Sequence, residues 1–474
     1  MWGYHQGALT TPSVGQRAAV GSSAHAGPSQ VVLIGNTSFP GDIDCSGSVD
    51  AIDALQVLRR VVGLEVSAAC ISYVGDVDCS GRIDAVDALL ILRWVAGLVG
   101  KLPGCNPTLW YLTRGVANTD EGWGVDVDSQ GNVYFATHQA DPGPWTDMII
   151  YKLASDGTEL WKTRWGGPWG EQAFVVTVAA GLVYVGGLTQ HGSAFPHDAD
   201  IAVIVLNAGD GSPVWQFTWD QGLGYEEVDG LVKDGDYLYV AGWTTGQTTS
   251  NDMVLLKLDL NGNTMWSTTW GTSGWDEENG QIVVDSQRVY LAGRYNAPNA
   301  LFGGDAVLAA FSRETGEFIA KAVWGGPLLD DALGMTGDGR DLYLVGISAN
   351  QGNAGQIFLL RYNTDLSLVW ETFWGGSGSE SARVVQTDSE GIPVADKTDS
   401  FGAGRDDLAL LRFSRSGELR WSQIWGGPGD EQSHGLAING PVAYIAGETT
   451  SYGAGKQDEL LVKVNAHTGQ FPQR

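Results

Sequence analysis

The sequence is short of basic residues, has a low total share of charged residues and contains no long apolar run. Of its 474 residues only 27 are Lys or Arg, against 55 Asp or Glu, so the formal net charge is −28. Clustered Lys and Arg are needed to bind nucleic acid or an anionic membrane surface, so this shortage argues against both functions. No window reaches the ~18 consecutive apolar residues of a membrane span. The composition leaves divalent cations and neutral partners open.

The N-terminal segment lacks the basic start and apolar stretch of a secretory signal peptide. Residues 1–40 are rich in Ser, Ala and Gly without periodicity, and we expect a linker or a disordered tail there. Cysteine is also scarce: the chain has four, and all of them lie between positions 45 and 105. The rest of the chain therefore has no thiol nucleophile, and it contains no GxSxG, HExxH or phosphate-loop motif.

Residues 41–105 contain a sequence duplication. DIDCSGSVDAIDALQVLRRVVGL, from Asp42, matches DVDCSGRIDAVDALLILRWVAGL, from Asp76. Oxygen-bearing residues alternate in both copies as in an EF-hand-type calcium loop, with Gly at the sharp turn and an acid at the last position. The pattern predicts two Ca²⁺ ions. The expected ligands are Asp42, Asp44, Ser46, Ser48 (through its carbonyl), Asp50 and Asp53, then Asp76, Asp78, Ser80, Arg82 (through its carbonyl), Asp84 and Asp87.

An amphipathic helix is expected after each loop, ended by Gly63 and Gly97. The alternative is a pair of Asp-capped helices without metal, but ligand positions that recur twice in register favour the metal loops. The apolar stripes are Ile52, Leu55, Leu58, Val61 and Val62 in the first helix and Val86, Leu89, Leu92, Val95 and Ala96 in the second.

This duplicated segment resembles a type I dockerin, a calcium-loop-plus-helix module with Asp at the last loop position. The resemblance implies a small all-α module that binds a cohesin module in a calcium-dependent way, usually to attach polysaccharide-degrading proteins to scaffolds or cell surfaces. In that family, two late loop positions and basic residues of the helix contact the cohesin. The Ser-Thr pair of many dockerins is an apolar pair here. The corresponding residues are Ala51, Ile52, Arg59, Ala85, Val86 and Arg93.

The four cysteines form a duplicated set, because Cys45 and Cys79 share a loop position while Cys70 and Cys105 follow the helices. An even set predicts two disulfides and an oxidising compartment, hence an extracellular or cell-surface protein. Zinc is the alternative, but no CxxC and no nearby His are present. Three connectivities are possible. If the halves pack antiparallel, helices of about 20 Å favour Cys70–Cys79 and Cys45–Cys105.

Residues 107–474 repeat about every 52 residues. Each unit has a strand such as VYVGG, a third strand that starts with Asp, a Gly turn and a strand containing Trp-x-x-x-Trp. Four short strands per unit without a helix pattern predict a β-propeller. The paired tryptophans are Trp161/Trp165, Trp215/Trp219, Trp266/Trp270, Trp370/Trp374 and Trp421/Trp425, with Trp324 alone in one unit.

Third strands occur seven times, but the last unit ends without its Trp strand. LWYLTR, from Leu109 to Arg114, aligns with that missing strand, so we expect the N-terminal strand to close the last blade. This part resembles the bacterial and archaeal β-propeller repeat family with the WGG and VYVAG patterns, which supplies a fold and no single activity. The chain is thus expected to be a multidomain monomer: an all-α dockerin-like module (41–105) joined to an all-β seven-bladed propeller (107–474).

An acidic residue follows each loop between repeats, near one mouth of the expected channel. These residues would either form a carboxylate ring that binds a cation or polar ligand, or each would cap its own loop, which we favour. The seven are Asp120, Glu171, Glu226, Glu277, Asp330, Glu380 and Glu431. The Asp before each third strand is expected to cap a turn; these are Asp147, Asp200, Asp252, Asp305, Asp407 and Asp458, with Gln356 as the exception.

The repeated tryptophans are expected to pack blade against blade, and residues outside the repeat are better site candidates. The resulting hypothesis is a non-catalytic extracellular protein, docked to a cohesin-like partner, whose propeller binds a glycan or a protein. The alternatives are a polysaccharide hydrolase or lyase with its site on the propeller face, and a structural surface protein. The candidates are Trp123, Trp145, Trp169, Trp243, Trp275, Tyr295, His138, His191 and His197.

Overall fold

The computed structural model describes residues 41–44, 46, 48–64, 66, 77, 83–99, 109–115, 119–140, 145–191, 198–222, 224–245, 251–271, 277–296, 303–350 and 354–472, without the side chains of 277–279. Ten of the residues singled out above lie outside this part of the chain. They are Cys45, Cys70, Cys79, Cys105, Asp76, Asp78, Ser80, Arg82, His197 and Trp275.

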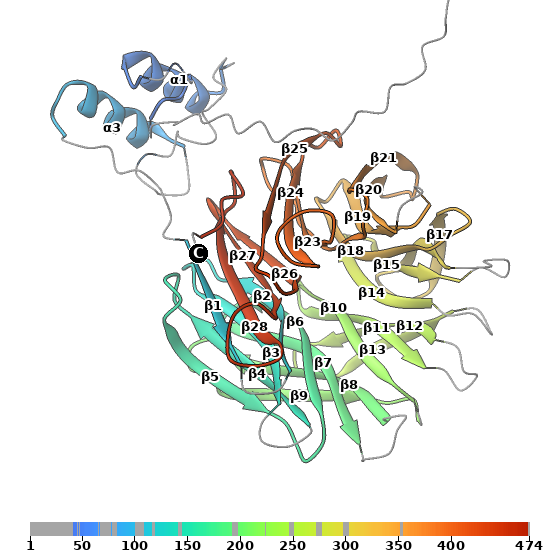
Figure 1. Cartoon of the computed structure of the whole chain (residues 1–474). Coiled ribbons are helices and arrows are strands. Elements are labelled where there is room, and N and C mark those ends of the chain that lie inside the picture. The colour runs from blue at the N-terminus through green and yellow to red at the C-terminus, as the bar shows by residue number, and fades with distance from the viewer. Residues whose placement is uncertain are drawn as a thin grey trace, which may run out of the picture. The chain divides into compact units, whose positions relative to one another are not determined.

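The described part of residues 41–105 contains two helices, α1 (Ala51–Val61) and α3 (Ala85–Val95), each in the place that the sequence predicts (Figure 1). Asp50 and Asp84 are their N-caps. Gly63 and Gly97 adopt left-handed φ values of +73° and +68° just beyond the helix ends, a conformation that glycine reaches without steric cost. No helix among the described residues is long and apolar enough to cross a membrane.

The core of this segment is small and is formed by other residues than those of the predicted stripes. The residues of the stripes are largely exposed instead. The buried apolar residues are Ile43, Ala54, Val57, Val77, Ala88 and Ile91.

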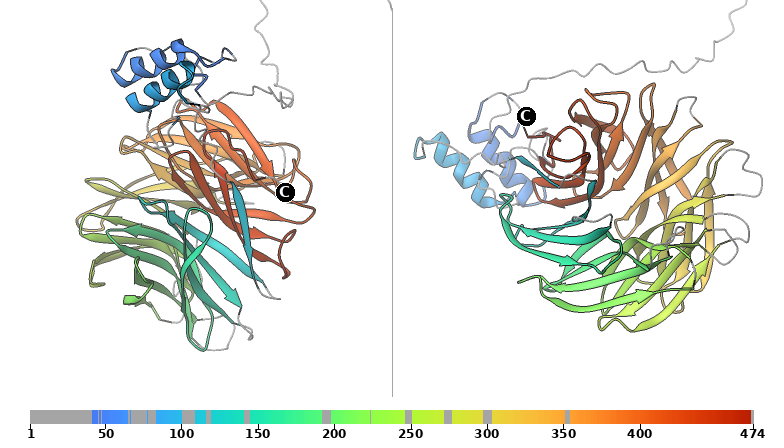
Figure 2. Two further views of the ribbon diagram at one scale, coloured as in Figure 1. Left: turned by 90° about the vertical axis from the view of Figure 1, so that its left-hand side faces the viewer. Right: turned by 60° about the horizontal axis from the view of Figure 1, so that its bottom comes forward.

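The remainder of the described chain forms seven antiparallel sheets of four strands each, the blades of a propeller. The right-hand view of Figure 2 shows the blades following one another around a centre. The first four are β2 (Asp120–Val127), β3 (Val133–Ala140), β4 (Thr146–Leu153) and β5 (Glu159–Trp165); β6 (Glu171–Ala179), β7 (Leu182–His191), β8 (Asp198–Asn207) and β9 (Pro213–Trp219); β10 (Glu226–Asp234), β11 (Tyr237–Thr245), β12 (Asn251–Asp259) and β13 (Thr264–Trp270); and β14 (Glu277–Val284), β15 (Arg288–Tyr295), β16 (Asp305–Ser312) and β17 (Phe318–Trp324).

The last three blades close the ring. They are β18 (Asp330–Gly337), β19 (Asp341–Ser348), β20 (Gln356–Asn363) and β21 (Leu368–Trp374); β22 (Glu380–Val385), β23 (Ile392–Thr398), β24 (Asp407–Phe413) and β25 (Leu419–Trp425); and β26 (Glu431–Asn439), β27 (Val442–Thr449), β28 (Asp458–Asn465) and β1 (Trp110–Arg114). The first strand of each blade packs against the first strands of both neighbouring blades, so these strands line the centre.

The N-terminal strand completes the last blade, as the sequence predicts. β1 pairs with β28 over its whole length, from Trp110 opposite Lys463 to Arg114 opposite Glu459. Figure 1 shows β1, in teal, beside β28, in red. The indole Nε1 of Trp110 donates to the carbonyl of Ser155 in the first blade at 3.2 Å, so the closing strand also contacts the next blade.

The repeated tryptophans pack between blades, as expected. Trp161 Nε1 donates to the Ala208 carbonyl of the next blade at 3.2 Å, and Trp215 Nε1 to the Leu260 carbonyl at 2.9 Å. A turn glycine of that next blade lies against the same ring, because a Cβ on Gly211 would come 2.7 Å from Trp161. The recurring turn glycine therefore makes room for the indole.

One blade interface departs from this pairing. Ala320 occupies the position of the first Trp, and Leu366 occupies the position of the turn glycine in the following blade. Leu366 keeps the left-handed conformation of that glycine, with φ at +68°. Its side chain packs on the cluster that contains Ala310, the strand partner of Ala320. The Leu366 side chain therefore compensates for the indole that is missing at Ala320.

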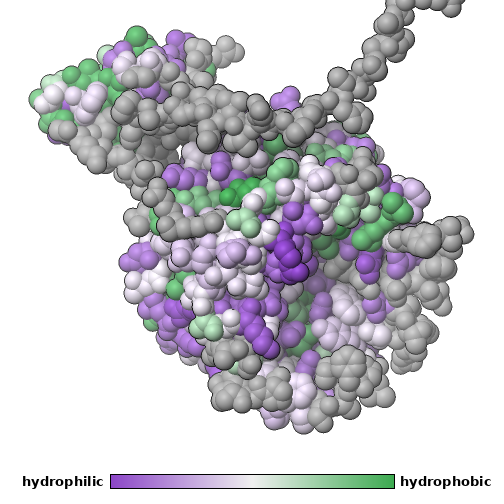
Figure 3. Space-filling model, viewed as in Figure 1, coloured by the Kyte–Doolittle hydropathy of each residue, from purple (hydrophilic) through white to green (hydrophobic). Residues whose placement is uncertain are grey.

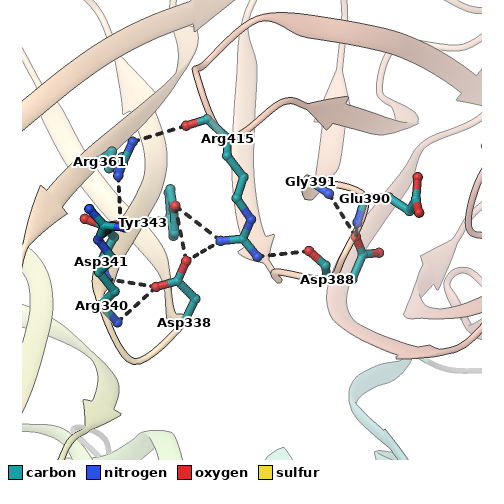
Figure 4. Close-up of polar contacts among 9 residues, drawn as sticks. All are labelled: Asp338, Arg340, Asp341, Tyr343, Arg361, Asp388, Glu390, Gly391 and Arg415. Atoms are coloured by element: carbon teal, nitrogen blue, oxygen red, sulfur yellow. Dashed lines mark hydrogen bonds and ion pairs between the residues drawn. The ribbon is translucent and has the colours of Figure 1, made fainter. Parts of the chain in front are cut away.

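Turn aspartates and arginines connect neighbouring blades at the ends of the strands (Figure 4). Arg415 forms an ion pair with Asp338 of the preceding blade, and its other guanidinium nitrogen donates to the Asp388 carbonyl at 2.9 Å. Arg361 Nη2 donates to Asp341 Oδ2 at 2.8 Å. Because Arg415 is partly exposed, its ion pair with Asp338 is expected to add little stability.

Candidate functional site

The first predicted calcium loop brings three carboxylates together. Asp42, Asp44 and Asp53 each offer one oxygen, and the three oxygens lie within 4.8 Å of one another. Asp42 and Asp53 are buried. An all-oxygen set at this spacing fits Ca²⁺, which takes oxygen ligands at about 2.3–2.6 Å.

Asp53 ties the loop to the start of α1. Its Oδ1 accepts the N–H of Ile43 at 2.7 Å and of Asp44 at 3.2 Å, while Oδ2 accepts the N–H of Asp50 at 2.7 Å. Burial raises the pKa of this carboxyl above its ordinary value, although these hydrogen bonds oppose the rise. The Asp50 carboxylate in turn caps the Ile52 N–H at 2.7 Å. The acid at the last predicted ligand position therefore also links the loop to the start of the helix.

The other ligand candidates of the first loop lie nearer to the surface. The Ser46 N–H donates to the carboxylates of Asp42 and Asp44, both at 3.0 Å. Its hydroxyl donates to the Ser48 carbonyl at 3.2 Å, the oxygen expected to serve as a ligand. The loop thus folds around its own carboxylates.

The described part of the second loop repeats this geometry. Asp87 is buried, and it accepts the N–H of Val77 at 2.7 Å and of Asp84 at 2.8 Å. Asp84 caps the Val86 N–H at 2.7 Å. The remaining ligand candidates of this loop lie outside the described residues.

The helices present matching apolar faces to solvent. Ile52 and Val86, at equivalent positions, are 52% and 49% exposed, and Leu55 and Leu89 are both 53% exposed. Green residues on the outside of this segment are visible in Figure 3. The six predicted partner-contact residues, Ala51, Ile52, Arg59, Ala85, Val86 and Arg93, are all exposed on α1 and α3.

The recurring acids of the propeller are buried where their side chains are described, and four of them cap the loop that precedes them. In Glu171, Oε2 accepts the Gly167 N–H at 3.0 Å and Oε1 accepts the Thr189 hydroxyl at 3.3 Å. Glu431 makes the same two bonds, with Gly427 and Thr449. Asp120, Glu226, Asp330 and Glu380 are equally buried, and the side chain of Glu277 is not described. These contacts agree with the expectation that the recurring acids cap their loops.

Glu226 differs from the other caps in its surroundings. Burial raises its pKa to about 7, and the charges of Asp200, Asp220 and Asp198 add to the rise.

Asp200 is one of the third-strand aspartates. Of this set, Asp407 caps a turn as expected, since it accepts the N–H of Gly404 at 2.8 Å.

A cavity of about 290 Å³ lies in the propeller channel, lined by the first strands of the blades. Figure 3 shows a hollow in the propeller face turned toward the viewer. Each first strand carries a β-bulge three residues after its recurring acid, and bulges redirect side chains. The bulge residues that line the cavity, here called the bulge ring, are Trp123, Phe174, Asp229, Leu333, Arg383 and His434.

The bulge ring is aromatic and basic along one arc. Trp123 stacks on His434 with ring centroids 4.0 Å apart and meets Phe174 edge-on at 5.0 Å. The Arg383 guanidinium lies 5.7 Å from the Trp123 ring centroid. The Trp123 indole therefore forms part of the cavity wall, and His434 covers one face of its ring.

One ion pair and one hydrogen bond, both to Glu121, hold this arc in place. Trp123 Nε1 donates to Glu121 Oε2 at 3.0 Å, and His138 Nε2 lies 3.3 Å from the same oxygen. Burial alone would raise the pKa of Glu121, but the hydrogen bond and charge of His138 outweigh it and lower that pKa to about 2. Glu121 is thus a fixed anion that orients the indole.

The sequence indicates only part of this site. Trp123 and His138 stand out because they break the repeat, whereas Phe174, Arg383 and His434 do not. One sequence signal could have indicated the whole bulge ring. The position three residues after each recurring acid carries a different residue type in each blade, whereas residue types recur at the positions beside it.

The other non-repeating candidates in the described residues lie in separate groups, although Trp169 and His191 line one pocket. Trp145 meets Trp169 edge-on at 5.8 Å, Trp243 stacks on Tyr225 at 5.1 Å, and Tyr295 stacks on Trp270 at 6.4 Å. His191 Nε2 lies 2.8 Å from Asp200 Oδ2.

Comparison with known proteins gives a likeness of fold. No protein-family model matches the chain, and no curated protein matches its sequence. Similar solved structures include the WD40 β-propeller domain of Doa1, with a TM-score of 0.47 and 10% identity over 74% of this chain and 97% of that one. The WD40 domain of Neurospora crassa Pan2 has a TM-score of 0.46 and 11% identity over 78% of this chain and 99% of that one. Likeness at this level carries no information about function.

Proposed function

We propose that this protein is an extracellular docking protein. Residues 41–105 would bind a cohesin-type module in a calcium-dependent way, and the propeller would be the part that is displayed. The observation that carries the proposal is the pair of matching apolar faces, Ile52 with Leu55 on α1 and Val86 with Leu89 on α3. Exposed apolar faces of this kind mark protein interaction surfaces.

Two calcium ions would couple the loops to these faces. Bound Ca²⁺ would neutralise the clustered carboxylates of each loop. Asp53 and Asp87 accept backbone N–H groups from both the loop and the helix start. A cation that fixes either carboxylate would also fix the first turn of its helix, and with it Ile52 or Val86. Partner binding would then depend on calcium without the ion touching the partner.

The direct test uses charged substitutions on the exposed faces. Leu55→Asp and Leu89→Asp are each expected to leave binding of a cohesin panel measurable through the other copy, and together to abolish it. Each buried leucine is worth about 1.5–3 kcal/mol, roughly ten- to a hundredfold in affinity. Asp210→Asn, in an exposed propeller turn, is the control. Unchanged affinity in the double variant, measured by calorimetry with calcium, would contradict the proposal.

For the propeller, we propose a glycan ligand in the channel cavity. The support is an aromatic wall, Trp123 and Phe174, beside hydrogen-bonding groups such as Gln281 and Arg383. Sugars use this combination of apolar faces and polar edges. The carboxylates that line the cavity, Asp126 and Asp229, accept backbone N–H groups of neighbouring blades at 2.7 and 3.0 Å. Both carboxylates thus hold neighbouring blades together, so we favour glycan binding over the hydrolase or lyase alternative.

A polysaccharide panel separates these functions. The full chain and Trp123→Ala are incubated with each polysaccharide, and both depletion from solution and release of reducing ends are recorded. Depletion by the wild type alone, without release, is the expected result. Release of reducing ends would establish the enzyme instead, and depletion by both proteins would remove the cavity from the proposal.

A further inference from the structure

The junction between the second and third blades breaks the repeat at one glycine. At four of the other junctions in the described residues, the first glycine after the Trp strand lies between two carboxylates. A Cβ on Gly166 would collide with Asp147 and come 2.8 Å from Glu171, and a Cβ on Gly325 would come 2.8 Å from Asp330. The sequence after Trp219 instead places Asp220 directly after the Trp strand and makes the connection one residue longer than after Trp165. A third carboxylate thus enters where the repeat has no side chain.

The changed connection also removes a hydrogen-bond donor. At four junctions the second glycine donates its N–H to the recurring acid, as Gly167 does to Glu171 at 3.0 Å and Gly376 to Glu380 at 2.9 Å. Among the described residues, Glu226 accepts only the Thr244 hydroxyl, on Oε1 at 2.7 Å. Its Oε2 is buried and has no hydrogen-bond partner among the described residues. Glu226 therefore lacks the glycine N–H donor of those four junctions and has the Asp220 carboxylate beside it instead.

The three carboxylates converge. Asp200, Asp220 and Glu226 each offer an oxygen, and these oxygens lie within 4.8 Å of one another. Asp200 and Glu226 are 6% and 1% exposed, and Oδ1 of Asp200 also has no partner among the described residues. Buried carboxylates without donors or cations are unfavourable. The contacts described for this cluster include one basic group, His191, on the other oxygen of Asp200.

We propose that this junction binds a Ca²⁺ ion through Asp200, Asp220 and Glu226. The donors are all oxygens, and Ca²⁺ at about 2.3–2.6 Å from each would span a group of this size. Asp220 is exposed, so water can complete the six to eight ligands that Ca²⁺ takes. The ion would replace the missing glycine N–H with a positive charge and would tie the second blade to the third.

The test is calcium calorimetry on the full chain with Asp220→Gly, which restores the residue of the other junctions. The variant is expected to bind one Ca²⁺ fewer than the wild type. Its thermal unfolding, followed by the near-UV signal of the propeller tryptophans, should lose the upward shift that calcium gives the wild type. Asp210→Asn, in a turn of the same blade, should keep both. Asp220→Asn guards against misfolding and should weaken the site at least tenfold.

Three results would overturn the assignment. They are equal calcium stoichiometry in the wild type and both Asp220 variants, a calcium-induced shift that survives in them, and a site that takes Zn²⁺ but not Ca²⁺. The assignment is independent of the loops in residues 41–105, because Asp44→Ala removes a loop ligand and should leave the propeller shift intact.

Discussion

Glu459 is a fully buried acid at a position where the other six third strands carry an apolar residue. It lies on β28 opposite Arg114, at the closure of the ring. Burial raises the pKa of its carboxyl from the ordinary 4.5 to about 8. The other residues at this position are Met148, Ile201, Met253, Ala306, Ile357 and Leu408.

Glu459→Gln should change the pH dependence of stability. The folded state holds a proton that the unfolded state has released above its ordinary pKa, so stability is full below about pH 4.5 and falls as pH rises to about 8. The slope approaches about 1.4 kcal/mol per pH unit. Melting temperatures of both proteins between pH 5 and 9 test this. The variant should show a flatter curve, and parallel curves would contradict the pKa shift.

The turn glycines offer a second test at single residues. Gly316 and Gly181 both have positive φ, at +74° and +79°. A Cβ on Gly316 would come 2.6 Å from Trp266, whereas nothing lies within 4 Å of one on Gly181. Both alanine variants should lose about 1–2 kcal/mol through the backbone, and Gly316→Ala about 1–3 kcal/mol more through overpacking. Equal losses in urea unfolding would argue against the indole contact.

At the scale of the element, the exchange of Trp and Gly for Ala320 and Leu366 predicts coupling. Ala320→Trp should cost about 1–3 kcal/mol by overpacking against the occupied interface. Leu366→Gly should cost a similar amount by leaving a cavity, less the relief of its left-handed backbone. The double variant restores the common pair and should be more stable than the sum predicts. A double-mutant cycle by urea unfolding measures this coupling, and additive losses would contradict it.

Strands were easier to predict than the roles of the helical faces. Trp pairs at even spacing and a turn signal in each unit fix the strands, because period-two patterns indicate which face is buried. The stripes containing Leu55 and Leu89 have helical spacing, but spacing alone cannot distinguish a core from a partner surface. The buried face here consists of small residues such as Ala54 and Ala88. Phe174, Arg383 and His434 of the bulge ring could not be predicted from strand alternation, because bulges break it.

At the scale of the whole molecule, the number of blades and the strand that closes the ring could be predicted from the sequence. The unit count and the match of LWYLTR to the Trp strands were enough, since an incomplete last blade needs a strand from the other end. The carboxylate cluster around Asp220 could not be predicted from the sequence, because it depends on which loops meet in space. The disulfides stay a prediction, since all four cysteines lie outside the described residues.

The closure predicts how truncations behave. A chain that starts at Asn106 keeps β1 and should retain the melting temperature of the propeller transition. A chain that starts at residue 116 lacks β1 and leaves β28 with an unpaired edge, so it should melt lower and aggregate. Thermal unfolding and light scattering compare the two. A stable, monomeric shorter chain would show that β1 is not needed to close the ring.

The most direct test of the docking account is the number of calcium ions bound through residues 41–105. Asp53→Ala with Asp87→Ala should remove two calcium sites in calorimetry, because each acid is the buried last ligand of its loop, and should leave the near-UV signal of the propeller unchanged. Ser48→Ala is the matched control, since that position would bind through its carbonyl, and it should keep both sites. Retention of both high-affinity sites by the double variant would contradict the calcium loops and the docking function built on them.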